Sequence, residues 1–437
     1  MGEVSRRDLL KVAGLGVTVG ALQGASLAYA VRTQNRILPP PKGKRVVIVG
    51  GGWAGVTAAK YLRKEEPGSE VILIEERKIF MSCPISNVWL AGLVDMEFLM
   101  HDFHTPASKY GYTFLNTRAT GVDRDKRRVY TAEGYVEYDY LILAPGIEYN
   151  YEAWFGNDRK LSRICSTSFP SAFIPGAEHV ALKRKIENFE EGTFVLTVPP
   201  PPHRCPPAPY ERAAMIAHVF KRNEVAGKLI VLDPKDGIRP KGPGFMSAYE
   251  ELYSDLIEYV PEAKIKEVDP VKKVVRTTAG DFRFDDANLN PPHRAGGIAR
   301  EAGLVNPKTG WCDVDPLTLQ SKEDPRIFVA GDASSVKGFP KSGDMAHNHA
   351  QRMVVRALIA LMRGRDPKSA VEAPTNTCYS MVNGDPKEAI VINVLYALDR
   401  EKGAPVKKKV RVENTRSKQL ARATFEWAKA LYRDMFS

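Results

Sequence analysis

The stretch Arg45-Val46-Val47-Ile48-Val49-Gly50-Gly51-Gly52-Trp53-Ala54-Gly55 decides the fold that we expect for this chain. Five apolar or strand-forming residues run into the pattern G-x-G-x-x-G, and residues 56–62 are then typical of a helix. A second apolar strand follows over 70–74 and ends at Glu75, about 20 residues past the last glycine, as this fingerprint requires. This order of elements predicts a Rossmann-like dinucleotide-binding domain.

The glycine loop has a defined chemical task in such a domain. Gly50, Gly52 and Gly55 let the backbone turn tightly and approach a pyrophosphate, and Ala54 stands in the same loop at the start of the helix. Glu75 is placed to accept hydrogen bonds from ribose hydroxyls, and its charge would repel a 2′-phosphate. We therefore expect these five residues to bind a dinucleotide cofactor.

Two later segments read as further strands of the same domain. Residues 138–144 form a strand that runs into a tight turn at Pro145 and Gly146. Residues 326–330 form another strand, which ends at Gly331 and Asp332. Asp332 has a plainer interpretation as a helix N-cap, and both roles can hold together. This spacing predicts a first domain that is split by a long insertion.

The insertion, roughly residues 156–290, repeats the layout of strand (193–198), loop, helix (210–221), strand (228–232) and acid (Asp233). Its loop, residues 199–209, contains no glycine and seven prolines. Prolines supply no backbone N–H and cannot take a positive φ, so this loop is badly suited to a nicotinamide pyrophosphate. We expect a second Rossmann-like domain that binds no NAD(P), with Cys205 standing where the phosphates would lie.

From about residue 44 to the C-terminus, the sequence resembles the flavoprotein subunit of flavocytochrome c sulfide dehydrogenase, and more loosely sulfide:quinone oxidoreductase. The most diagnostic motifs are Arg204-Cys205-Pro206-Pro207-Ala208-Pro209 and Asn376-Thr377-Cys378-Tyr379. The resemblance also rests on residues 49–52, 82–87, 143–148, 210–212, 291–296, 310–312, 340–343 and 380.

The resemblance implies that FAD is the cofactor and that Cys205 and Cys378 form a redox-active disulfide over the flavin. Cys83 matches a cysteine that makes a thioether to the flavin, although Pro84 follows it where the family pattern has a tyrosine. Glu211 matches a glutamate near the disulfide and is a candidate general base. In flavoproteins that this segment resembles, Asp332 faces the ribityl–pyrophosphate part of FAD, and Lys341 and the helix after Gly343 would lie near the charge of the reduced flavin. The remaining cofactor-binding candidates are therefore Pro145, Gly146, Gly331, Asp332, Lys341, Ser342 and Gly343.

Plainer interpretations stand beside these roles. The Cys205–Cys378 pair would close a loop of 173 positions, and as a structural staple it would stabilise the fold by about 4–5 kcal/mol. Glu211 could simply be an acid in the first turn of a helix. We expect Cys312 in a core and assign no role to Cys165. His347 and His349 point apart on a helix and lack a third ligand, so we expect no metal site.

The implied activity is sulfide oxidation through the disulfide and the flavin, with the thiolate of Cys378 donating to the flavin. The chain has no C-x-x-C-H and therefore no c-type haem of its own, and the resemblance implies a separate cytochrome c subunit as the electron acceptor. The formal charge of +11 suits an acidic partner protein. The sequence has no basic helix interleaved with aromatic residues, so it gives no indication of nucleic-acid binding. A peripheral sulfide:quinone oxidoreductase is one alternative, and a non-catalytic flavin-binding redox or assembly protein is another.

Residues 1–30 read as a twin-arginine export signal, from Arg6-Arg7 to a cleavage site at Ala28-Tyr29-Ala30, which implies a periplasmic protein. Its apolar run is too short and glycine-rich for a membrane anchor, and no later stretch is long enough to span a bilayer. A helix over 418–436 places Leu420, Thr424, Trp427, Leu431 and Met435 along one face for core or partner contact.

We expect an α/β chain with two Rossmann-like domains and a smaller α+β domain. The expected divisions are the signal (1–30), the FAD domain (31–155 and 291–368), the second Rossmann-like domain (156–290) and a C-terminal interface domain (369–437).

Overall fold

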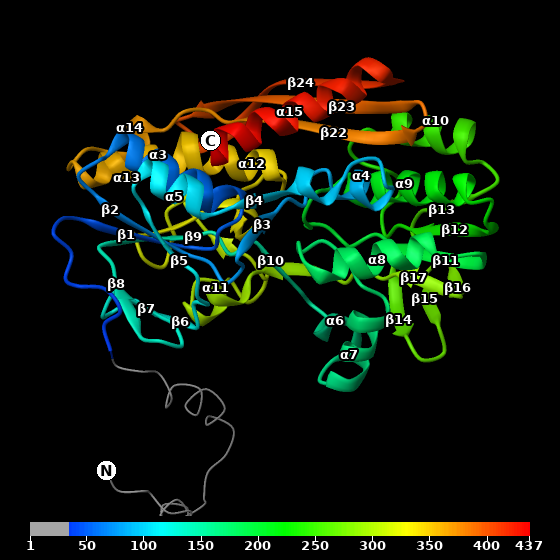
Figure 1. The fold of residues 1–437 in the computed structure, drawn as a ribbon, viewed down its shortest axis with the longest axis horizontal. Helices are drawn as coiled ribbons and strands as arrows, with labels where there is room; N and C mark the ends of the chain where they lie inside the picture. Colours follow the sequence, from blue (N-terminus) through cyan, green and yellow to red (C-terminus); the bar gives the residue numbers. More distant parts are fainter. Residues whose placement is uncertain (1–34) are drawn as a thin grey trace, which may run out of the picture.

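The computed structural model describes residues 35–437 (Figure 1), so the expected export signal at residues 1–30 lies outside the described residues. Two parallel sheets stand side by side, and a third, antiparallel sheet lies across both of them. Within residues 35–437, no helix is both long and apolar enough to cross a bilayer.

The first sheet forms from the strands that the sequence predicts for the dinucleotide domain. Its order is β20-β9-β1-β2-β5 and all of its pairings are parallel. The strands of a parallel sheet are covered on both faces, and accordingly all five residues of β1 are buried. The strands are β1 (Arg45–Val49), β2 (Glu70–Ile74), β5 (Thr113–Leu115), β9 (Tyr140–Leu143) and β20 (Ile327–Val329), and α3 (Trp53–Glu65) joins β1 to β2.

The predicted split of this domain is confirmed by the pairing of β20 with β9, in which Ile327 lies opposite Leu141. The chain leaves the first sheet after β9 and returns to it at β20. In between, β10 (Ile147–Tyr149) pairs with β18 (His293–Ala295) in a separate two-stranded sheet. Around this sheet lie β3 (Ile79–Met81), α4 (Ser86–Leu90), η1 (Met96–Leu99), β4 (Met100–Asp102), α5 (His104–Tyr110), β6 (Gly121–Asp123), β7 (Arg128–Tyr130) and β8 (Tyr135–Glu137).

The intervening residues build the second sheet, of order β13-β12-β11-β17, with parallel pairings. Its strands are β11 (Glu191–Thr197), β12 (Ala226–Leu232), β13 (Ile257–Val260) and β17 (Asp286–Asn288). The helices of this region are α6 (Glu152–Phe155), α7 (Arg159–Ser168), α8 (Ala177–Glu187), α9 (Ala208–Arg222) and α10 (Gly242–Leu252), and β14 (Ile265–Asp269), β15 (Val274–Thr277) and β16 (Gly280–Arg283) form a small antiparallel sheet. The predicted second Rossmann-like unit is therefore present.

The return segment completes the first domain with short elements. They are α11 (Gly297–Glu301), β19 (Cys312–Asp313), η2 (Gly331–Ala333), β21 (Ser334–Ser335), α12 (Gly343–Asn348), η3 (His349–Val354), α13 (Val355–Met362) and α14 (Pro367–Ala370). Asp332 lies inside η2, whose N-cap is Ala330, so the N-cap interpretation of Asp332 is wrong. Cys312 is fully buried, as expected, and so is Cys165.

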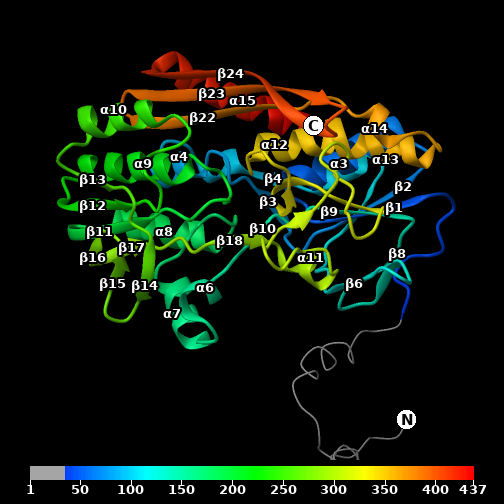
Figure 2. The same cartoon turned by 180° about the vertical axis from the view of Figure 1, so that it is seen from behind.

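The C-terminal region is an antiparallel sheet of β22 (Thr375–Gly384), β23 (Lys387–Asp399) and β24 (Ala404–Ser417), followed by α15 (Lys418–Phe436). Figure 2 shows this red-to-orange layer running over both Rossmann-like domains. Strand β22 contacts α12 of the first domain and α9 of the second. This region therefore bridges the two parallel sheets.

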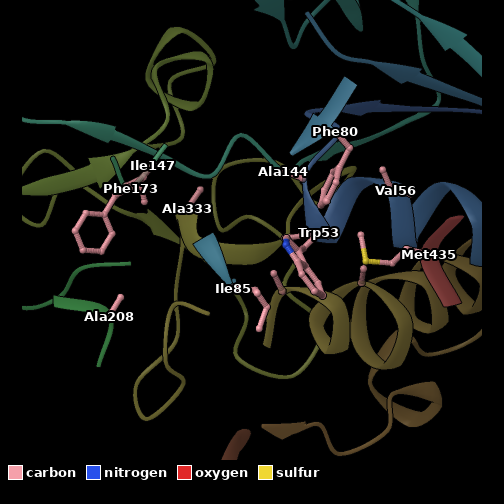
Figure 3. Packing of buried hydrophobic residues seen from close by; sticks show 14 of the residues in the cluster. Trp53, Val56, Phe80, Ile85, Ala144, Ile147, Phe173, Ala208, Ala333 and Met435 are labelled. Carbon is pink, nitrogen blue, oxygen red and sulfur yellow. The ribbon is translucent and has the colours of Figure 1, made fainter. Parts of the chain in front are cut away.

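Helix α15 has the bounds that its sequence predicts, and its apolar face packs inward. The ring of Trp427 stacks on Trp53 with centroids 6.3 Å apart, and Met435 is buried near Trp53 in Figure 3. Asp434 fixes the end of the helix: its carboxylate accepts a hydrogen bond from Tyr61 Oη at 2.8 Å and lies 2.7 Å from His347 Nε2. Lys60 Nζ lies 3.5 Å from the same carboxylate.

Because of these contacts, the contribution of Asp434 to the stability of the fold depends on pH. Burial opposes its ionisation, but the hydrogen bonds to His347 and Tyr61 and the charge of Lys60 outweigh burial and hold its pKa at about 2. A carboxyl group whose folded pKa lies below its unfolded value of about 4 stabilises the fold above that value, and the contribution disappears as the pH falls toward the folded pKa.

We expect Asp434→Asn to lower the free energy of unfolding by about 1–3 kcal/mol at neutral pH, since it removes a partly buried charge from its partners. Urea unfolding followed by circular dichroism measures this change. The difference in the free energy of unfolding between Asp434→Asn and the native protein should become smaller as the pH falls below about 4. The control Glu426→Gln, which loses only an exposed pair with Lys429 on the same helix, should stay within about 0.5 kcal/mol. Equal changes in the free energy of unfolding for the two variants would contradict this stabilising role of Asp434.

Candidate active site

A cavity of about 960 Å³ runs from the end of β2 to the C-terminal region. Glu75 and Thr117 line it beside the first sheet, and the glycine loop and Cys83 line it further along. The second domain and the C-terminal region complete its wall, at Cys205, Glu211, Cys378 and Trp427. The cavity therefore joins the predicted dinucleotide site to the predicted cysteine pair.

The glycine loop is shaped as the sequence predicts. Gly50 has φ +104°, and a Cβ there would lie 2.3 Å from the carbonyl oxygen of Ala144. A Cβ on Gly55 would lie 1.8 Å from the oxygen of Gly50, so only glycine allows the loop and α3 to approach so closely. A Cβ on Gly52 would meet nothing within 4 Å, and Gly52 lines the cavity. This open space beside bare backbone fits a pyrophosphate.

Glu75 holds this loop in place. Its carboxylate accepts a hydrogen bond from the backbone N–H of Gly51 at 2.6 Å and from Arg77 Nε at 2.9 Å. Burial opposes the ionisation of Glu75, but Arg77 and the backbone N–H groups outweigh it and lower the pKa. Glu75 is therefore an anion that lines the cavity at the end of β2, as the ribose-binding prediction requires.

Most of the other predicted cofactor residues also line the cavity, namely Ala54, Cys83, Pro145, Gly146, Gly331, Asp332, Ser342 and Gly343. Gly55 stands behind the loop as a packing residue. Lys341 is the exception among the charged residues. Its ammonium group donates to the carbonyl oxygens of Asp332 and Ser334 at 2.7 and 2.9 Å and lies over the Trp311 ring.

Lys341 does not line the cavity, so its predicted role near the charge of the reduced flavin stays a prediction. Burial lowers the pKa of Lys341 to about 8. The contact of Lys341 with the cysteine loop is made by its backbone, because its carbonyl oxygen accepts a hydrogen bond from Cys205 N at 2.6 Å. The motif located the right segment, but sequence cannot tell which way a lysine side chain turns.

Arg204 fastens the proline-rich loop to the first domain. Its Nε donates to Asp332 Oδ2 at 2.6 Å, and its Nη1 donates to the carbonyl oxygen of Phe173 at 2.9 Å. Figure 3 places Phe173 close to Ile147 and Ala208, where the two domains meet. Gly146, with φ +66°, leaves room for the guanidinium, since a Cβ would lie 2.4 Å from Nη2.

The structure brings Cys205 and Cys378 together as free thiols at the wall of the cavity, close enough for each to shift the pKa of the other, although 173 positions separate them in the sequence. Cys205 has φ +49°, an uncommon backbone conformation for a residue with a side chain, directly before α9. Cys378 lies on β22. The hydrogen bond to Cys378 and burial raise the pKa of Cys205, whereas the same hydrogen bond lowers the pKa of Cys378.

Glu211 stands beside this pair with both carboxylate oxygens engaged. Oε2 accepts from Asn87 Nδ2 and Oε1 accepts from the backbone N–H of Met381, both at 2.8 Å. Glu211 also lies in the first turn of α9, so the plainer interpretation holds as well. Burial raises its pKa, which moves the carboxyl group toward the range useful for a general base.

Cys83 occupies a separate place in the wall. Its thiol donates weakly to the carbonyl oxygen of Phe173 at 3.5 Å, and burial raises its pKa. Pro84 packs against Gly343, where a Cβ would lie 2.7 Å from Pro84 Cγ. Cys83 therefore lines the cavity although a proline follows it.

Sequence reasoning missed three polar residues of this site. Asn87 binds Glu211, Asp344 accepts from Thr377 N at 2.9 Å and from Trp427 Nε1 at 3.2 Å, and Lys241 reaches Cys378. Asn87 ends a segment that the resemblance already marked. Lys241 stands in no motif, and no sequence signal could have found it. Within the described chain, no group of acidic, histidine or cysteine side chains is suited to a metal ion.

Two dinucleotide-type domains, a glycine-lined cavity and a cysteine pair at its end define a flavoprotein oxidoreductase. Three family models match: sulfide dehydrogenase [flavocytochrome c] flavoprotein chain, central (residues 179–291), pyridine nucleotide-disulphide oxidoreductase (44–163), and flavocytochrome c sulphide dehydrogenase, flavin-binding (372–436). The chain belongs to the family of flavocytochrome c sulfide dehydrogenase flavoproteins and the related sulfide:quinone oxidoreductases, which are flavin-dependent enzymes.

Individual relatives agree with this family. The chain is 54% identical over 44 residues to the sulfide dehydrogenase [flavocytochrome c] flavoprotein chain of Chlorobaculum thiosulfatiphilum, which is 10% of this chain and 92% of that sequence. It is 27% identical over 334 residues to the sulfide-quinone reductase of Aquifex aeolicus, covering 70% and 74% of the two sequences. The crystal structure of the sulfide:quinone oxidoreductase from Aquifex aeolicus superposes with a TM-score of 0.69 at 20% identity, covering 90% and 92%.

Proposed function

We propose that this protein is an FAD-dependent sulfide dehydrogenase that works through a Cys205–Cys378 disulfide. The observation that carries the proposal is the contact between two thiols from distant parts of the chain at the wall of the glycine-lined cavity. FAD bound there would accept two electrons from the sulfur centre and release them singly. The glycine loop, Glu75, Asp332 and Gly343 are the residues that would hold it.

In the proposed reaction, HS⁻ attacks one sulfur of the oxidised pair. The Cys205–Cys378 bond breaks, a new sulfur–sulfur bond forms to the incoming sulfide, and one cysteine leaves as a thiolate. The products are a cysteine persulfide and a thiolate, so the disulfide has been reduced and the sulfide sulfur oxidised. Glu211, with its raised pKa, is placed to take the proton from H₂S or from the persulfide.

The contacts of Asp233 support an enzyme that does not use NAD. This residue stands at the end of the second domain's β12, where a dinucleotide domain would contact a ribose. It is fully buried and accepts hydrogen bonds from Tyr210 Oη at 2.5 Å, Tyr259 Oη at 2.8 Å and Lys235 Nζ at 2.7 Å. The chain's own side chains therefore satisfy this carboxylate.

We also propose a c-type cytochrome as the electron acceptor and the periplasm as the compartment. The name of the Chlorobaculum relative supports the first, and the Arg6-Arg7 motif supports the second. A basic face on β24 suits an acidic partner, because Lys407, Lys408, Lys409 and Arg411 are all exposed. The competing acceptor is quinone, which the names of the Aquifex and mouse relatives favour.

A non-catalytic flavin protein is the alternative of another class. In that case the cysteine pair would serve only as a staple, and its disulfide would be inert to sulfide. Both thiols line the cavity, which favours the catalytic role.

We expect Cys205→Ser and Cys378→Ser each to abolish the bleaching of the flavin by sulfide, because neither variant can form the disulfide that HS⁻ attacks. Anaerobic absorption spectroscopy with sodium sulfide measures this. Cys165→Ala, which removes a buried thiol from a separate core cluster, should bleach normally. Unchanged bleaching in either serine variant would refute the disulfide mechanism.

Covalent attachment of FAD through Cys83 is a second proposal about the site. We expect the acid-precipitated native protein to stay yellow and the precipitate of Cys83→Ser to lose its flavin, since only the thiol can form a thioether. Absorption of the washed pellet measures this. A colourless native pellet would show that the flavin is held without a covalent bond.

The two acceptors can be separated directly. Sulfide-reduced protein should pass electrons to an acidic c-type cytochrome faster at low salt than at high salt, because salt screens the attraction between a basic surface and an acidic partner. For a basic acceptor the expected salt effect is therefore inverse to that for an acidic c-type cytochrome. Faster turnover with a soluble quinone than with either cytochrome would favour the quinone reductase.

A further inference from the structure

Lys241 is a buried lysine that the proposed mechanism does not yet use. It immediately precedes α10 of the second domain and is only 3% exposed. Its Nζ donates to the carbonyl oxygen of Cys378 at 3.0 Å and to Ser380 Oγ at 2.7 Å, and lies 3.9 Å from Cys378 Sγ. The amine therefore contacts the strand that carries one of the two reacting sulfurs.

The backbone at Lys241 is held in an uncommon conformation. Its φ is +65°, in the left-handed region that costs a residue with a side chain about 1 kcal/mol or more. Such a conformation persists only where the surroundings over-determine it, and it is often found at functional sites. Here it turns a lysine at the start of a helix inward, toward β22.

Among residues 35–437, Lys241 forms no direct ion pair with a carboxylate. Its charge acts on the carboxyl group of Glu211, but its hydrogen-bond acceptors are a carbonyl and a hydroxyl. A buried cation with only neutral hydrogen-bond partners is costly, so an anion nearby would stabilise it. The sulfur of Cys378 can supply that anion.

The two sulfurs consequently lie in different electrostatic surroundings. Four groups act on Cys378: the hydrogen bond from Cys205 and the charge of Lys241 favour its thiolate, whereas Glu211 and Asp344 oppose it. Around Cys205, the groups Cys378, Cys83 and Glu211 all oppose a thiolate. Lys241 does not line the cavity, so it acts on the sulfur and not on a ligand bound there.

We propose that Lys241 stabilises the sulfur of Cys378 as the leaving group, so that sulfide attacks Cys205 and the persulfide forms there. The proposal rests on the disulfide mechanism proposed above. In this step HS⁻ bonds to Cys205 Sγ, the Cys205–Cys378 bond breaks, and its electron pair stays on Cys378 as a thiolate beside the ammonium group. The proton remains on the outer sulfur of the Cys205 persulfide. Attack occurs at the sulfur whose partner leaves most easily, which is the physical basis of this choice.

The first test locates the persulfide in the native protein. The oxidised holoprotein is mixed with one equivalent of sodium sulfide, quenched with iodoacetamide, and its peptides are weighed by mass spectrometry. The peptide with Cys205 should carry the extra sulfur and the peptide with Cys378 should carry a simple alkyl group. An extra sulfur on Cys378 would overturn the inference and leave the disulfide mechanism standing. No extra sulfur on either cysteine, with no flavin bleaching, would instead refute the proposed function.

The second test removes the charge of Lys241. After reduction of the disulfide, the pH midpoint for alkylation of Cys378 should move upward by about one unit or more in Lys241→Met, and sulfide bleaching at pH 7 should slow about tenfold. Lys241→Arg should recover most of the midpoint because it keeps the charge. Ser380→Ala, which removes only the hydroxyl partner of the amine, is the matched control and should leave the midpoint near that of the native protein.

A variant that merely loses structure would change the flavin spectrum and the thermal midpoint of unfolding, and not only the pH midpoint for alkylation of Cys378. The flavin spectrum and the thermal midpoint are followed in each variant. A native alkylation midpoint in a folded Lys241→Met protein, or an equal shift in Ser380→Ala, would overturn the role of the charge. If Lys241→Met does not fold, the persulfide location in the native protein still decides the inference.

Discussion

The attachment of the proline-rich loop to the first domain is the contact on which the rest of this structure depends. Arg204 pairs with Asp332 at 2.6 Å, and the next residue, Cys205, donates its backbone N–H to Lys341. Both charged side chains are largely buried, so separating them would leave charges without partners in a medium of low dielectric constant. The loop of one domain is therefore bound directly to the cofactor cavity of the other.

The C-terminal region positions the second sulfur by a similar set of contacts. Thr377 N donates to Asp344, Met381 N donates to Glu211, and the Ser342 hydroxyl donates to Asn376 Oδ1 at 2.7 Å. These partners belong to the first domain, the second domain and the first domain respectively. Since β22 is fixed on both sides of Cys378, the sulfur has little freedom to move away from Cys205. The bridging layer thus has a chemical consequence as well as a structural one.

The sequence predicted most of this architecture because the relevant signals are local. The glycine loop, the buried strands and the acid at Glu75 each follow from a few adjacent residues, and the structure confirms both Rossmann-like units and the split of the first. The pairing of Cys205 with Cys378 came from a resemblance, because no local rule connects positions so far apart. Two side-chain directions were not predicted from the sequence. Lys341 turns away from the cavity, and Lys241 turns toward Cys378 from a loop that contains no motif. Direction of this kind depends on tertiary packing, which sequence patterns do not encode.

The second domain keeps a nucleotide-binding layout but carries a cysteine in the loop before the helix of that layout. Its strand, loop, helix and acid remain in order, and the turn before α9 still contains a residue with positive φ, as a glycine-rich loop would. That residue is Cys205, whose side chain makes the conformation costly and whose neighbours hold it in place. The N–H groups that would face a phosphate are replaced by prolines, and Asp233 is satisfied by Tyr210 and Tyr259. The loop therefore keeps the geometry that aims it at the cavity, while its chemistry has changed from anion binding to a thiol.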